Sequence, residues 1–250
     1  MFTINTQFVA RLKEHDGDAW FELWEVFGPT IERMVYSLSS RYFSQETVKD
    51  ISQETLMQLF EEIGRFDTQR GVKFSTWLYA IAKHIVASEL TYRNALKRNK
   101  GVKPLSLSET FDEGTPVQSP QDEFEREVFR AKVYRAFKLV EKKSDFLEFE
   151  VYKMKISRKI RSLDIAAIMG ISEASVSRYL KKIRERLRRT LAEVVREYSW
   201  TEEEFGEIGK NRLDSADEAQ FDAAIGDIYL QMEQDHRSYD RLSKTARGIF

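Results

Sequence analysis

Apolar residues recur at helical spacing along almost the whole of this 250-residue chain, and this periodicity limits the fold more than any other feature. In residues 50–63 and 74–90 they fall three or four positions apart, which places them on one face of a helix. Similar patterns over 18–27 and 29–42 predict two further helices, with Pro29 in a first helical turn. The chain has only 4 Pro and 11 Gly, too few for the many turns of a sandwich or barrel. We therefore predict an all-α fold.

The composition changes between residues 101 and 122. This stretch holds Pro104, Pro116 and Pro120 among Ser, Thr, Gly and acidic residues, and it has no helical period. Such a composition is typical of a linker between two folded parts. The prediction is an N-terminal helical domain, a linker, a second helical domain and an acidic helical C-terminal segment. Their expected bounds are 1–100, 101–122, 123–197 and 198–250.

The net charge of −1 conceals a strong segregation of charge along the chain. Residues 83–103 carry a local charge of +5 and residues 153–189 one of +9. The stretches 101–127 and 201–235 carry −5 and −9. Two separate basic blocks favour two surfaces for a polyanion such as a nucleic acid. Ordinary solvated helix faces are the alternative explanation for each block taken alone.

Several classes of protein and site are excluded by what the chain lacks. It contains no Cys, so disulfide scaffolds, thiolate zinc sites and cysteine nucleophiles are ruled out. His15, His84 and His236 do not fall at metal-ligand spacing, and no glycine-rich phosphate loop occurs. We expect no enzyme activity, no metal and no cofactor. No apolar run is long enough to cross a membrane and residues 1–14 do not resemble a signal peptide, so we expect a cytoplasmic protein without membrane insertion.

Residues 162–180 have the spacing of a helix-turn-helix. Ala166 is small enough for a second helix to cross closely above it, Gly170 suits the turn, and Ser172 can cap the second helix. The outer face of that helix combines short polar side chains with cations, as a helix that reads the major groove requires. An ordinary helical hairpin is the alternative. The candidate DNA contacts are Ser172, Glu173, Ser175, Ser177, Arg178, Lys181 and Lys182.

Two segments upstream of the helix-turn-helix are distinctive: 50–56 (DISQETL) and 65–82 (RFDTQRGVKFSTWLYAIA). Together they resemble region two of bacterial sigma factors. The similarity is greatest to the minimal two-domain extracytoplasmic-function (ECF) sigma factors, whose region four ends in a helix-turn-helix followed by a basic helix. The resemblance extends over residues 18–191 and includes the order of both domains.

This resemblance implies a sigma factor that binds core RNA polymerase and directs promoter recognition and transcription initiation. Asp50, Gln53 and Glu54 would contact the clamp helices of the largest polymerase subunit. A second group would bind the melted minus-ten element of the promoter, by stacking, by edge contacts or by phosphate contacts. Its members are Phe66, Lys73, Ser75, Trp77, His84, Arg93, Lys97 and Arg98. The helix-turn-helix residues would face the minus-thirty-five element, with Arg178, Lys181 and Lys182 foremost.

Some alternatives stay open. Aromatic residues at helical spacing also build cores, so Trp77 is expected mostly in the core and Phe66 in either place. A helix-turn-helix regulator that never joins the polymerase is a second functional hypothesis, and an anti-sigma or adaptor protein is a third. An anti-sigma factor or another regulator could also be a partner of the chain.

The C-terminal segment contains two further helix signals. Residues 199–202 are interpreted as a capping box, and residues 215–218 begin a longer amphipathic helix. Its apolar stripe must pack against something, and its outer face carries much of the local negative charge. We expect the segment to fold back and compete for basic surface, to stabilise the second domain, or to bind a separate regulator. The stripe consists of Phe221, Ala224, Ile225, Ile228, Tyr229 and Met232.

Overall fold

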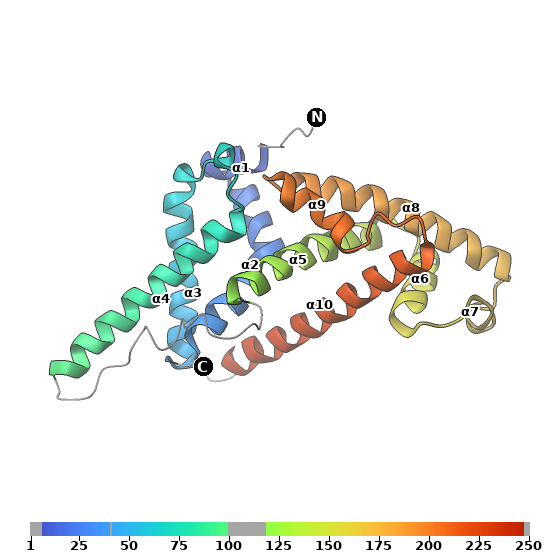
Figure 1. The fold of residues 1–250 in the computed structure, drawn as a ribbon. Helices are drawn as coiled ribbons and strands as arrows, with labels where there is room; N and C mark the ends of the chain where they lie inside the picture. Colours follow the sequence, from blue (N-terminus) through green and yellow to red (C-terminus); the bar gives the residue numbers. More distant parts are fainter. Residues whose placement is uncertain (1–6, 41, 100–118, 248–250) are drawn as a thin grey trace. The chain divides into compact units, whose positions relative to one another are not determined.

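The computed structural model describes residues 7–40, 42–99 and 119–247, with side chains to 96 and to 235 in the last two ranges. These residues form helices and no strand, so the prediction of an all-α fold is confirmed (Figure 1). Two short 3₁₀ turns lie between α3 and α4, at Ile63–Arg65 and Thr68–Arg70. The helices are α1 (Gln7–Lys13), α2 (Gly17–Ser39), α3 (Gln45–Glu62), α4 (Phe74–Asn99), α5 (Pro120–Lys143), α6 (Phe146–Arg158), α7 (Ser162–Met169), α8 (Glu173–Glu197), α9 (Glu202–Lys210) and α10 (Glu218–Arg247).

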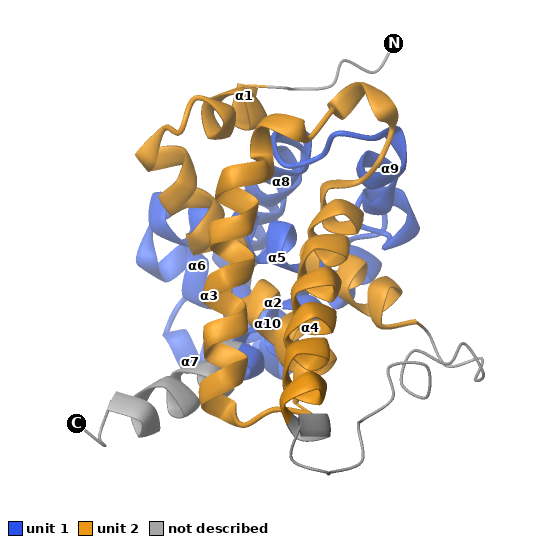
Figure 2. Ribbon diagram, turned by 90° about the vertical axis from the view of Figure 1, so that its left-hand side faces the viewer, with its two compact units in different colours: residues 1–6, 129–250 blue, residues 7–128 orange. Residues whose placement is uncertain are grey.

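The chain divides into two compact units (Figure 2). The N-terminal unit is Gln7–Val128, and the C-terminal unit is Phe129–Phe250 together with Met1–Thr6. The boundary between them falls inside α5, which contributes its first turns to one unit and the remainder to the other. The compact units therefore differ from the four segments predicted from the sequence, since residues 198–235 pack within the same unit as α6 to α8.

The beginning of α5 corrects the predicted linker of 101–122. Residues 120–122 are helical, whereas 101–118 lie outside the described residues. The Oγ of Ser119 accepts a hydrogen bond from the Asp122 amide at 3.1 Å, and the Asp122 carboxylate accepts one from the Ser119 amide at 3.3 Å. Pro120 occupies the first helical position, where its missing N–H costs nothing. A proline that appeared to mark the linker therefore begins the helix.

Helix α2 corrects a second expectation. The sequence predicts separate helices over 18–27 and 29–42, but one helix runs through Pro29 from an N-cap at Asp16. Proline removes one hydrogen bond from a helix interior and usually kinks or breaks it. Here Phe27 and Ile31 are buried on either side of the proline, so packing on both flanks holds the helix together.

Three helices build the core of the N-terminal unit. α2, α3 and α4 pack pairwise, and α3 and α4 lie side by side in Figure 2. The connection between α3 and α4 turns at Gly71, whose φ of 66° is in the left-handed region that favours glycine. The predicted apolar positions Ile51, Leu59 and Ile85 are buried, as the helical spacing required.

In the C-terminal unit α6 packs against α7, α8 and α10. Both helices predicted for the C-terminal segment are present, but each begins slightly later in the chain than predicted. The capping box is made by Thr201 and Glu204 instead of starting at Ser199: the Thr201 amide donates to the Glu204 carboxylate at 3.1 Å, and the Glu204 amide donates to the Thr201 hydroxyl at 3.2 Å. Asp217 caps α10 by accepting from the amides of Ala219 and Gln220.

Candidate nucleic-acid interface

The pair α7 and α8 is joined by a short turn whose geometry follows from its sequence. Gly170 has a φ of 64° and ends α7, and the Ile171 amide donates back to the Ala166 carbonyl at 3.1 Å. Ser172 caps α8 by accepting a hydrogen bond from the Ser175 amide at 3.1 Å. Val176 at the inner face of α8 is fully buried. The two helices are thus fixed at a tight turn by caps and by apolar packing.

The outer face of the first turns of α8 is open to solvent. Arg178 donates to the Ser175 hydroxyl at 3.0 Å, and this contact holds the guanidinium along the helix. Lys182 pairs with the buried Glu148 of α6, whereas Lys181 makes no such pair among the described residues and is exposed. The candidate contacts on this face are exposed except Ser175, which is half-buried: Ser172, Glu173, Ser175, Ser177, Arg178, Lys181 and Lys182. Cations beside short hydroxyls suit phosphate and base-edge contacts.

Basic residues continue along α8 beyond this face, but there they contact residues of α10 instead of solvent. Arg184 is buried and pairs with Asp222 and Glu218 of α10. Burial opposes its charge, but these carboxylates hold the pKa of Arg184 above its ordinary value. Arg188 lies 4.3 Å above the ring of Phe221. The acidic helix α10 therefore covers Arg184 and Arg188 of α8, whereas Arg178 and Lys181 remain exposed.

The predicted polymerase contacts lie together on one exposed face of α3. Asp50, Gln53 and Glu54 are all exposed, at positions three or four apart along the helix. Acidic and amide side chains in this arrangement suit a basic helical partner.

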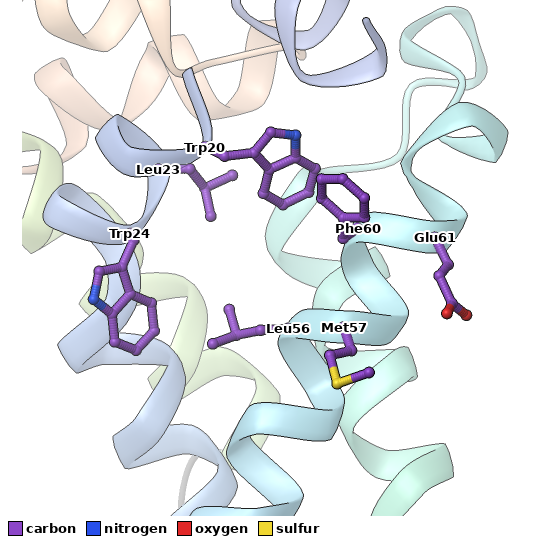
Figure 3. A pocket seen from close by; sticks show the side chains of 7 residues that line it. All are labelled: Trp20, Leu23, Trp24, Leu56, Met57, Phe60 and Glu61. Atoms are coloured by element: carbon purple, nitrogen blue, oxygen red, sulfur yellow. The ribbon is translucent and has the colours of Figure 1, made fainter. Parts of the chain in front are cut away.

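Beside this face lies an apolar groove that sequence reasoning missed. We name it the α2–α3 groove; it has a volume of about 330 Å³ and is drawn in Figure 3. Met57 and Phe60 are exposed in it, and the Phe60 ring lies 4.9 Å from that of Trp20. The sequence does contain a signal for it. Trp20 and Trp24 lie one turn apart in α2, and Met57 and Phe60 are apolar residues of α3 that fall outside its buried apolar stripe. The lining residues are Trp20, Leu23, Trp24, Leu56, Met57, Phe60 and Glu61.

The residues predicted to bind the minus-ten element do not form one exposed surface. Phe66 and Ser75 are buried, and the Phe66 ring packs 5.1 Å from that of Trp77, which is half-buried. In this conformation neither Phe66 nor Ser75 can reach a base, because both complete the core around the α3–α4 connection. The structure thus places Phe66 in the core, one of the two positions left open for it.

Other members of this group are accessible or paired. His84 is exposed on α4. Arg93 donates to Glu89 at 2.6 Å and to Thr47 at 3.0 Å. Its side chain is nevertheless partly exposed. The side chains of Lys97 and Arg98 lie outside the described residues. Tyr92, which was not predicted, is 61 % exposed on α4 two turns after His84.

Lys73 is held by a carboxylate from α5. Its Nζ donates to Glu125 at 2.7 Å, within the N-terminal unit. Burial opposes ionisation of Glu125, but hydrogen bonds from Lys73, Gln121 and Thr76 outweigh it and hold the pKa of that carboxyl below its usual value. Glu125 is therefore charged at neutral pH and neutralises Lys73.

Among the described residues, no group of three or more His, Asp or Glu side chains could hold a metal ion. Over the same residues, no helix combines the length and apolarity that crossing a membrane requires.

Comparison with known proteins gives one assignment. Residues 28–95 match the family model described as Sigma-70 region 2, so the chain contains a Sigma-70 region 2 domain. The match covers the second half of α2, all of α3, the α3–α4 connection and most of α4. No curated protein matches the chain. The domain supports membership of the sigma-70 superfamily and a role in polymerase binding and promoter recognition.

Proposed function

We propose that this chain is a sigma factor of the ECF type, a cytoplasmic subunit that binds core RNA polymerase and directs transcription initiation. The Sigma-70 region 2 domain at residues 28–95 carries this proposal. The helix pair α7–α8 downstream supports it, because a capped helix with an exposed basic face suits a second promoter element. The protein would catalyse no reaction itself and would need no cofactor.

In this proposal the N-terminal unit docks on the polymerase through α3. Asp50, Gln53 and Glu54 supply polar and acidic contacts to a basic helix of the polymerase clamp. Met57 and Phe60 in the neighbouring α2–α3 groove add apolar area to the same interface.

Promoter DNA would meet both units. On the N-terminal unit we assign the melted minus-ten strand to Lys73, His84 and Arg93, with Trp77 at the edge of the core and Lys97 and Arg98 following along α4. On the C-terminal unit the exposed face of α8 would contact the minus-thirty-five element through Arg178, Lys181 and Lys182.

The second hypothesis is a helix-turn-helix regulator that binds DNA without the polymerase. The exposed basic face of α8 favours it as much as it favours a sigma factor. Size-exclusion chromatography with purified bacterial core polymerase separates the two. Co-elution in a one-to-one complex is expected for the sigma factor, whereas separate elution together with DNA binding would favour the regulator. Capture of an anti-sigma factor would add a partner to the first hypothesis.

A further inference from the structure

The start of α5 carries a carboxylate that occupies donors in the region assigned to the minus-ten strand. Glu125 accepts hydrogen bonds from Lys73 Nζ at 2.7 Å and from the Thr76 hydroxyl at 3.0 Å. Gln121, one turn earlier in α5, donates to the same carboxylate at 3.2 Å. The side chains of Lys73 and Glu125 are only 14 % and 16 % exposed. The ion pair is therefore largely shielded from solvent, unlike an exposed ion pair at the surface.

Neighbouring residues of α5 anchor this contact on both sides. Phe124 is buried, and its ring lies 6.4 Å from that of Tyr79 in α4. Glu127 pairs with Arg33 of α2, with Arg33 Nε 3.3 Å from the carboxylate. The first two turns of α5 therefore dock as a segment on α2 and α4.

A carboxylate and a phosphate compete for the same donors. An ammonium group and a hydroxyl that bind a carboxylate can bind a phosphate oxygen in the same way. Glu125 is negatively charged, so it also repels a strand that approaches Lys73. Docked α5 thus covers both donors with a group that resembles part of a nucleic-acid backbone.

We propose that the first two turns of α5 are an autoinhibitory segment, in which Glu125 covers Lys73 and Thr76 until a melted DNA strand displaces it. The inference rests on the proposed function, since Lys73 must belong to the DNA surface. It adds that the free protein holds this part of the surface closed. Release of α5 accompanies strand binding.

Binding of single-stranded DNA to the full chain tests the segment. The probe is a fluorescein-labelled mixed-sequence strand of about 20 nucleotides, followed by fluorescence anisotropy over a range of salt concentrations. Glu125→Gln is expected to raise affinity by about three- to tenfold at low salt. The slope of log affinity against log salt should steepen by about 0.7, the value for one more phosphate contact on a single strand.

Matched variants separate a freed contact from a change in overall charge. Glu123→Gln makes the same charge change two residues away, on a carboxylate that pairs with Arg126 of the same helix, and should leave the slope unchanged. Glu125→Asp keeps the charge but shortens the reach, and it should also raise affinity. In a Lys73→Gln background the effect of Glu125→Gln should shrink and the added steepness of the salt slope should be lost, because only the Thr76 hydroxyl remains to be freed. Thermal melting checks that each variant remains folded.

Two results would overturn the inference. Equal affinities and slopes for Glu125→Gln, Glu123→Gln and the unchanged chain would show that α5 does not close the surface. If Lys73→Gln also left binding unchanged, Lys73 would not belong to the DNA surface and the segment would have nothing to inhibit. Neither result bears on co-elution of the unchanged chain with core polymerase, so failure of the inference and failure of the proposed function remain distinguishable.

Discussion

Arg184 of α8 and Asp222 of α10 form a buried, two-pronged ion pair. Nε lies 3.0 Å from Oδ1 and Nη2 lies 2.6 Å from Oδ2, and both side chains are less than a tenth exposed. The pair joins a helix proposed to contact DNA to the acidic C-terminal segment. α10 is consequently part of the packing of the C-terminal unit, which favours the stabilising role among those expected for that segment.

Asp222→Ala should destabilise the C-terminal unit by about 3–5 kcal/mol, because it leaves the buried guanidinium of Arg184 without its main partner. Urea unfolding, followed by hydrogen exchange in peptides from α8 and α10, measures the loss. Asp227→Ala is the control, since Asp227 is 72 % exposed and lies 4.0 Å from Lys159; its effect should stay within about 0.5 kcal/mol. Equal effects of the two variants would contradict a structural role for the buried pair.

Gly226→Ala should loosen α10 from α6. An added Cβ would lie 2.8 Å from the Ile156 carbonyl oxygen, so one helix must shift, at a cost of about 1–3 kcal/mol. Gly206→Ala in α9 is the matched control because its Cβ would meet nothing within 4 Å. The control should be neutral or stabilising by up to about 1 kcal/mol, since alanine favours a helix over glycine. Thermal melting measures both effects. If the melting temperatures of both variants were higher than that of the unchanged chain, or both lower, the close approach of α6 and α10 would be refuted.

Glu54→Lys should weaken binding to core polymerase by about tenfold, because a cation would face the basic helix for which the acidic face of α3 is suited. Competition between the variant and the unchanged chain for purified core enzyme measures the change. Glu14→Lys carries the same change in charge on an exposed residue that follows α1, and it should bind normally. Normal binding of both variants would remove α3 from the proposed interface.

Arg178→Ala should weaken binding to a duplex with the correct upstream element by about 1–3 kcal/mol if the guanidinium contacts a base edge. Arg196→Ala provides the control, because Arg196 is exposed at the other end of α8. Electrophoretic mobility shifts with specific and scrambled duplexes distinguish the kinds of contact. An equal loss on both duplexes would mark Arg178 as a phosphate contact, and no loss on either would exclude it from the interface.

The regular parts of the fold could be predicted because local periodicity determines them. In α10 the spacing of Phe221, Ile225, Tyr229 and Met232 predicts one apolar face, and all four are buried. Turn and cap chemistry at Gly170 and Ser172 is local in the same sense. Where a local rule competes with packing it fails, as at Pro29, because flanking buried residues hold the helix together through a proline.

The candidate site was less predictable because contacts distant in sequence shape it. Phe66 follows a short 3₁₀ turn, where helical period gives no orientation, and only its packing on Phe74 and Trp77 places it in the core. No local pattern links Lys73 with Glu125, which meet only because the first turns of α5 dock on the N-terminal unit.

The central claim is that this chain gives core polymerase its promoter specificity, and run-off transcription tests it most directly. Chromatin mapping of the protein with start-site sequencing after its overexpression would supply a candidate promoter. Purified core enzyme, this chain and that promoter should together produce a transcript of the mapped length, and core enzyme alone should not. Binding of the chain to the promoter without initiation by the core enzyme would contradict the sigma-factor assignment.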